Sequence, residues 1–112
     1  MRVNELCKIA HKIAREKGFW GGFAEDLKTQ KSFYVYLRNQ GELIALMHSE
    51  LSEALEALRQ EDKSKNNVGE ELADCCIRIF DYCEAYDIDL EKAINDKIKI
   101  NRNRPKKHGK NF

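Results

Sequence analysis

The chain has 112 residues with one proline and six glycines, and 42% of its residues are hydrophobic while 35% are charged. This length supports one domain with a single core, and this composition is typical of a folded helical protein rather than a disordered chain. No apolar run approaches the roughly 18 residues that a membrane span needs, and the first residues lack the apolar stretch of a signal peptide. We therefore expect a cytoplasmic protein with no membrane partner.

The net charge of +1 conceals an uneven distribution of charged residues. Residues 97–112 contain seven of the 20 Lys and Arg residues and none of the 19 acidic ones, so the rest of the chain carries a net charge of −6. An acidic body with a basic tail favours a polyanionic ligand bridged by a metal ion. The four cysteines include no C-x-x-C pair, so we interpret them as small hydrophobic residues rather than as a disulfide or a zinc site.

Apolar residues at helical spacing predict a first helix over residues 3–17, ended by Gly18. An aromatic, glycine-rich segment follows, and the pattern up to Gln40 is ambiguous. Residues 33–37 fit either a short strand or a helical turn, and we expect a loop with a short helix here.

The clearest helical pattern covers residues 41–60, with a wide apolar stripe on one face. A polar connector over 61–67 separates it from a third predicted helix, 68–86, whose expected buried residues include Leu72 and Cys76. Asp89 is expected to begin a fourth helix that ends near Ile100, and the tail from about 101 contains Pro105. The sequence therefore predicts an all-α protein, a four-helix bundle forming a single domain over 1–112 with a basic C-terminal tail.

Two pairs of acidic residues lie on the second and third predicted helices: Glu50 with Glu53, and Glu71 with Asp74. Each pair shares one helical face at the margin of the apolar stripe, and Arg78 continues the line of the second pair. An isolated E-x-x-E is usually a solvated edge, but antiparallel packing across the short connector would make the two pairs face each other. Carboxylates removed from water cost several kcal/mol unless they are paired, so this cluster favours a bound cation. Oxygen ligands suit Mg²⁺ or Mn²⁺, and these ions suit phosphate chemistry.

The fourth predicted helix places polar residues where its periodicity predicts apolar ones. Lys97 and Asn101 continue the line of Ile94, and Arg104 follows one turn later. In the functional interpretation Lys97 and Arg104 neutralise phosphate oxygens and Asn101 positions a ligand by hydrogen bonding. The alternative is that Lys97 extends outward into solvent.

Several other kinds of site lack support in the sequence. None of His11, His48 and His108 has a glutamate three residues before it, which argues against a di-iron carboxylate bundle. There is no G-x-x-x-x-G-K-[ST] phosphate-binding loop and no Ser/His/Asp arrangement.

The pattern Glu50-x-x-Glu53 followed by Glu71-x-x-Asp74 resembles that of the MazG-like, all-alpha nucleoside triphosphate pyrophosphohydrolases. The strings over 42–57 and 101–110 are similar to those of small stand-alone members, including phage-associated ones, and the resemblance covers roughly residues 40–110. It implies a helical bundle that assembles as a dimer or tetramer. It also implies Mg²⁺-dependent hydrolysis of a nucleoside triphosphate to a monophosphate and pyrophosphate. The metal ligands and catalytic residues would be Glu50, Glu53, Glu71 and Asp74.

The sequence allows two roles for its aromatic residues and more than one function. Trp20, with Phe19 and Phe23, is expected either to stack on a nucleobase or to belong to the core or to an oligomer contact. The expected partners are a nucleoside triphosphate and one or more further copies of the chain, and no nucleic acid is expected. The substrate would be bound by Lys97, Asn101, Arg104 and Trp20. One rival is a non-enzymatic helical module that binds a protein or nucleic acid through its basic tail, and another is a phosphoribosyl-ATP type pyrophosphohydrolase.

Overall fold

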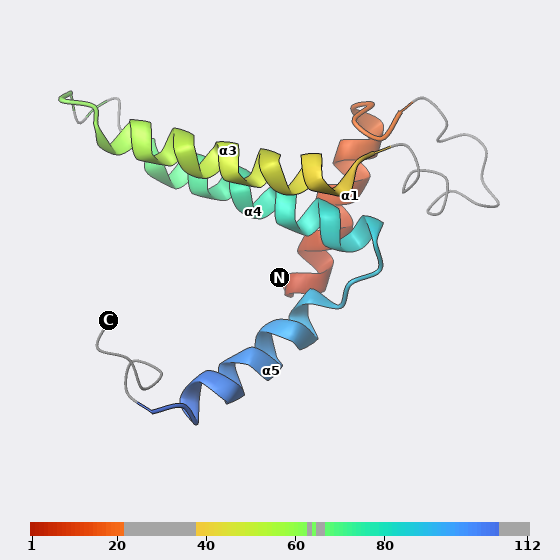
Figure 1. Cartoon of the computed structure of the whole chain (residues 1–112). Helices are drawn as coiled ribbons and strands as arrows, with labels where there is room; N and C mark the ends of the chain where they lie inside the picture. The colour runs from red at the N-terminus through yellow and green to blue at the C-terminus, as the bar shows by residue number, and fades with distance from the viewer. Residues whose placement is uncertain (22–37, 63, 65–66, 106–112) are drawn as a thin grey trace.

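The computed structural model describes residues 1–21, 38–62, 64 and 67–105, and it contains four helices in this part of the chain. They are α1 (Val3–Glu16), α3 (Gln40–Leu58), α4 (Val68–Ala85) and α5 (Leu90–Arg102), shown in Figure 1. The predicted all-α class and the four predicted helices are confirmed, with ends that differ by at most a few residues. The ambiguous segment at 33–37 lies outside the described residues.

The helix ends follow from local sequence features. Gly18 adopts a positive φ of 86° just after α1, a conformation that glycine allows at no steric cost. The side chains of Asn39 and Asp89 cap α3 and α5 by accepting hydrogen bonds from the backbone N–H of Glu42 (3.1 Å) and Lys92 (3.0 Å). These caps fix where both helices begin.

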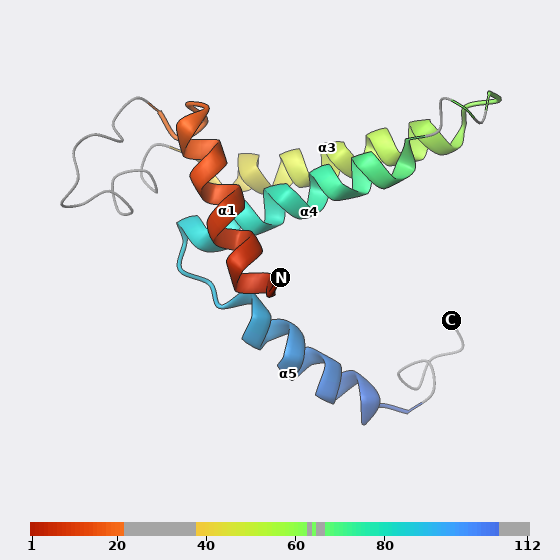
Figure 2. The same cartoon turned by 180° about the vertical axis from the view of Figure 1, so that it is seen from behind.

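Helices α3 and α4 form an antiparallel hairpin, and they run side by side in both views (Figures 1 and 2). Small buried side chains line their contact, including Ala54 and Cys75, whose Sγ donates to the Met47 carbonyl at 3.6 Å. Small residues let two helices approach closely. The antiparallel packing expected from the short connector is therefore confirmed.

Helix α1 crosses the other side of α4, so that α4 lies between α1 and α3 (Figure 2). The core at this crossing is built around Trp20, which has an exposed fraction of 0%, with Leu43 and Ala85. Tyr82 and Tyr86 pack against this core. Because Trp20 and Leu43 flank the segment that leads into α3, this core anchors the start of the hairpin.

Helix α5 extends away from the hairpin, and its start is held against the start of α1 (Figures 1 and 2). Asn4 joins the two elements: its Nδ2 donates to Asp89 Oδ1 at 2.9 Å, and its Oδ1 accepts from the Glu91 backbone N–H at 3.2 Å. No residue of α5 is buried. Within one chain, therefore, three helices share a core and α5 forms an arm.

The apolar stripe of α3 is wider than the surface that α4 covers. Leu51, Leu55 and Leu58 remain exposed and form one face of α3, which we call the leucine face. On α4, Leu72 and Cys76 are also exposed, so the prediction that both are buried is wrong for the single chain. They lie on the part of α4 that neither α1 nor α3 covers.

All four cysteines lie within the described residues and are free thiols, and Cys7, Cys75 and Cys83 are buried. Burial raises the pKa of each of these three thiols, which keeps them protonated and unreactive. The interpretation as small hydrophobic residues is confirmed for these three cysteines, whereas Cys76 is exposed. Among the described helices, none combines the length and the hydropathy that crossing a membrane requires.

Candidate metal centre

The α3–α4 hairpin brings three glutamates together near its middle. One carboxylate oxygen from each of Glu50, Glu53 and Glu71 lies within 4.8 Å of the other two. The spacing of three residues puts Glu50 and Glu53 on the same face of α3, and the antiparallel partner presents Glu71 to them. Glu50 is buried, with an exposed fraction of 7%. The predicted convergence of carboxylates from two helices is therefore present for these three residues.

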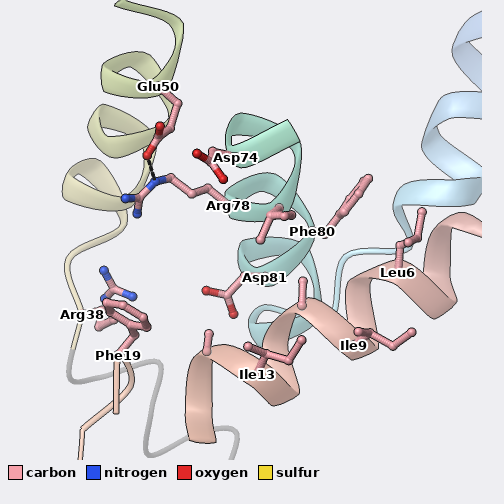
Figure 3. Close-up of a pocket in the computed structure, with 13 residues that line it drawn as sticks. Leu6, Ile9, Ile13, Phe19, Arg38, Glu50, Asp74, Arg78, Phe80 and Asp81 are labelled. Atoms are coloured by element: carbon pink, nitrogen blue, oxygen red, sulfur yellow. Dashed lines mark hydrogen bonds and ion pairs between the residues drawn. The ribbon is translucent and has the colours of Figure 1, made fainter. Parts of the chain in front are cut away.

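Asp74 lies one turn further along α4 and is not part of this tightest group. Figure 3 shows its carboxylate facing the same space as that of Glu50. Its negative charge raises the pKa of Glu71, as do the charges of Glu53 and Glu50. Asp74 therefore belongs to the same acidic neighbourhood as the three glutamates.

The surroundings of Glu71 disfavour its negative charge. A hydrogen bond with Glu53 raises the pKa of the Glu71 carboxyl, and desolvation and the three neighbouring negative charges raise it further. Glu71 Oε1 accepts a hydrogen bond from Asn67 Nδ2 at 3.2 Å, whereas Oε2 is buried with no hydrogen-bond partner among the described residues. A buried oxygen without a partner is costly, and a cation would satisfy it.

The donor set fits a hard divalent cation. It consists of carboxylate oxygens, which are the ligands that Mg²⁺ and Mn²⁺ prefer, and it includes no sulfur or imidazole. The orphaned oxygen of Glu71 and the mutual repulsion around it are what such an ion would relieve. Glu50, Glu53 and Glu71, with Asp74 beside them, are the residues that would hold it.

An ion pair across the hairpin was not predicted from the sequence. Arg78 Nε donates to Glu50 Oε1 at 2.8 Å, and the side chains are 39% and 10% exposed. The pattern placed Arg78 on the same line as Glu71 and Asp74, but helical spacing gives no information about which residue of α3 it meets.

A cavity of about 540 Å³ opens beside this cluster (Figure 3). Its apolar wall comes from α1, Phe19 and two residues of α4, and its charged wall includes Glu50, Asp74 and Arg78. A space with one apolar wall and one charged wall suits a ligand that has both kinds of surface.

A second buried polar group lies on the far side of this cavity. Trp20 Nε1 donates to Asp81 Oδ1 at 2.9 Å, and His11 Nδ1–H donates to the same oxygen at 2.7 Å. The Arg38 guanidinium lies 4.9 Å from the centre of the Trp20 ring. Trp20 is thus part of the core, which was the alternative to nucleobase stacking, whereas Phe19 lines the cavity and Phe23 lies outside the described residues. One signal was available in the sequence, because Asp81 lies on the helical face of Asp74, two turns later.

The α5 residues are not brought to the carboxylates within one chain. Lys97, Asn101 and Arg104 are exposed, on or just after a helix that runs away from the hairpin in both views (Figures 1 and 2). The inward orientation expected for Lys97 and Asn101 is therefore absent from the single chain, because among the described residues nothing buries that part of α5.

Fold and site together define an all-helical protein with a cluster of acidic residues on a helical hairpin that could hold a divalent cation. Residues 38–108, more than half of the chain, match the model of the MazG nucleotide pyrophosphohydrolase domain, and the chain belongs to this family. All four acidic residues lie within the matched range, whereas α1 and Trp20 precede it. Searches of curated proteins and of solved structures gave no match.

Proposed function

We propose that this protein hydrolyses nucleoside or deoxynucleoside triphosphates to the monophosphate and pyrophosphate, using Mg²⁺ held by Glu50, Glu53, Glu71 and Asp74. The observation that carries the proposal is the convergence of glutamate oxygens from α3 and α4 within 4.8 Å of one another, in a member of a nucleotide pyrophosphohydrolase family. Mn²⁺ would fit the same oxygen donors. Family membership favours this function over a non-enzymatic interaction module.

The acidic residues would have different roles in metal binding and proton transfer, according to their burial. When bound, the divalent ion would polarise the phosphate and lower the pKa of water. Glu50, which is buried, would act as a fixed ligand, and Glu71 would contribute the oxygen that now has no partner. Glu53 is the exposed member of the three converging glutamates, so among them it is the residue best able to meet an attacking water and accept its proton.

Lys97, Asn101 and Arg104 would bind the triphosphate and sugar of the substrate. Their positive charges and amide group suit phosphate and hydroxyl oxygens. Their exposure on α5, away from the hairpin of the same chain, is compatible with their acting at the site of a neighbouring copy.

We further propose that the protein is a homodimer or homotetramer. The leucine face of α3 and the isoleucines of α5 are exposed in the single chain, and apolar surfaces of this kind usually mark contacts between proteins. Light scattering at micromolar concentration is expected to give a mass of two or four chains. A monomer under these conditions would contradict the assembly.

The activity is tested by incubating the protein with a panel of nucleoside triphosphates and Mg²⁺, and identifying the products by chromatography. We expect monophosphate and pyrophosphate in equal amounts, and no product when a chelator removes the metal. Release of orthophosphate and a diphosphate would indicate a different bond, and no turnover of any nucleotide would contradict the proposal. Including phosphoribosyl-ATP in the panel separates the rival activity on the same kind of scaffold.

A further inference from the structure

Arg78 places a cation against the most buried carboxylate of the metal centre. Its Nε donates to Glu50 Oε1 at 2.8 Å across the hairpin, and the Glu50 side chain is only 10% exposed. A carboxylate in such a place is costly without a positive partner. In the structure, Arg78 is that partner.

A divalent ion bound by Glu50 would repel the guanidinium beside it. The two cations would share one carboxylate only a few ångströms apart, and like charges at that separation disfavour each other strongly in a partly buried site. Metal binding at Glu50 and the Arg78–Glu50 pair therefore oppose each other.

The Arg78 side chain can also reach a ligand in the cavity. Its side chain is 39% exposed and lines the cavity, and in Figure 3 its guanidinium lies below Glu50, between α3 and α4. An arginine has five N–H donors in a planar fork that matches phosphate oxygens, and the hydrogen bond to Glu50 uses the one on Nε. The other cation of this cavity, Arg38, lies over the ring of Trp20.

We propose that Arg78 is an exchangeable counter-ion: it neutralises Glu50 in the metal-free protein, and it transfers to the phosphate oxygens of the substrate when the metal takes Glu50. This inference rests on the proposed function and adds a phosphate-binding residue to it. Arg78 would compete with the metal for Glu50 and would bind the anionic substrate. Its removal would therefore strengthen metal binding and weaken anion binding.

The test compares Arg78→Met with the wild-type protein in two calorimetric titrations. In the first, Mn²⁺ alone is the ligand, and we expect its Kd to fall about tenfold, a change of about 1.4 kcal/mol, because Glu50 is no longer occupied. In the second, the preformed Mn²⁺ complex of inorganic tripolyphosphate is the ligand, and we expect its Kd to rise about tenfold because a charge-assisted contact is lost. Arg78→Lys keeps the charge and is expected to give smaller changes in both titrations.

Arg59→Met is the matched control. Arg59 pairs with Glu56 at 3.1 Å on the surface of α3, with side chains 67% and 65% exposed, so neither Kd is expected to change. Circular dichroism of each variant verifies that the helices are retained.

A role for Arg78 in structure alone would leave both Kd values unchanged or weaken both, and either result overturns the inference. A change in only one of the two Kd values also overturns it. These failures are distinct from a failure of the proposed function. If wild-type protein releases pyrophosphate and binds Mn²⁺, the proposed function stands whatever Arg78→Met does, whereas wild-type protein that binds no Mn²⁺ contradicts both.

Discussion

Replacing Glu53 by Gln is expected to lower the rate of pyrophosphate release by about a thousandfold, because a metal site supplies several kcal/mol of transition-state stabilisation and each 1.4 kcal/mol is a factor of ten. Glu53 is the exposed member of the three converging glutamates and contacts Glu71. The amide is nearly the same size as the carboxylate, so the helices should be retained. The measurement is the initial rate of pyrophosphate release with saturating Mg²⁺.

Glu56→Gln is the control for this prediction. Glu56 lies on the same helix and is exposed, with Arg59 as its partner, so its replacement should leave the rate unchanged. Wild-type activity in Glu53→Gln would remove Glu53 from the site. Equal losses in both variants would point to a general effect of charge on α3.

Glu53→Gln should also affect stability, in the opposite direction from activity. Contact with Glu53 raises the pKa of Glu71, so the fold favours the protonated form of Glu71. That contribution to stability is complete below the ordinary glutamate pKa of about 4.3 and is lost as the pH rises through the raised value. Without metal at neutral pH, the variant should therefore melt at a higher temperature than wild type, and the difference should disappear in acid. A lower melting temperature at neutral pH would show that the two carboxylates do not repel each other.

Replacing Asp81 by Ala should destabilise the protein by about 3 kcal/mol, since it leaves buried donors on two residues without an acceptor. Trp20 is fully buried and His11 is 4% exposed, and both donate to Asp81. Asp81→Asn keeps an acceptor oxygen and should cost less. Urea unfolding is the measurement, and because Trp20 is the single tryptophan of the chain, its fluorescence reports directly on this cluster.

Asp96→Asn provides the comparison for Asp81. Asp96 pairs with Lys92 on the surface of α5, with side chains 51% and 71% exposed, so its replacement should change the free energy of unfolding by less than about 0.5 kcal/mol. Equal stabilities of the Asp81 and Asp96 variants would mean that the Trp20 contacts contribute nothing measurable.

The parts of this protein that the sequence predicted are those governed by local rules. Helical spacing placed Glu50 with Glu53 and Glu71 with Asp74, and the short polar connector required α3 and α4 to be antiparallel. Those two facts are sufficient to bring carboxylates from both helices together. Gly18 and Asp89 marked helix ends through backbone and capping preferences that depend on a few neighbouring residues.

The parts that were missed depend on contacts between distant segments. Asp81 meets His11 and Trp20, which are 70 and 61 residues away in sequence, and no periodicity within α4 indicates which residues of α1 it will face. The Arg78–Glu50 pair depends on the exact offset between two helices. The start of α5 is held by Asn4 near the opposite end of the chain, so the repeating apolar line of α5 could not show that the helix extends away from the hairpin.

The acidic centre is contained in one helical hairpin, within residues 50–74, and this has a consequence for how it forms and how it can diverge. Contacts between residues close in sequence close small loops, so they form early and rapidly during folding. The acidic cluster can thus assemble before α1 packs against the hairpin and α5 against α1. Sequence changes in those flanking helices can therefore leave the convergence of the three glutamates intact.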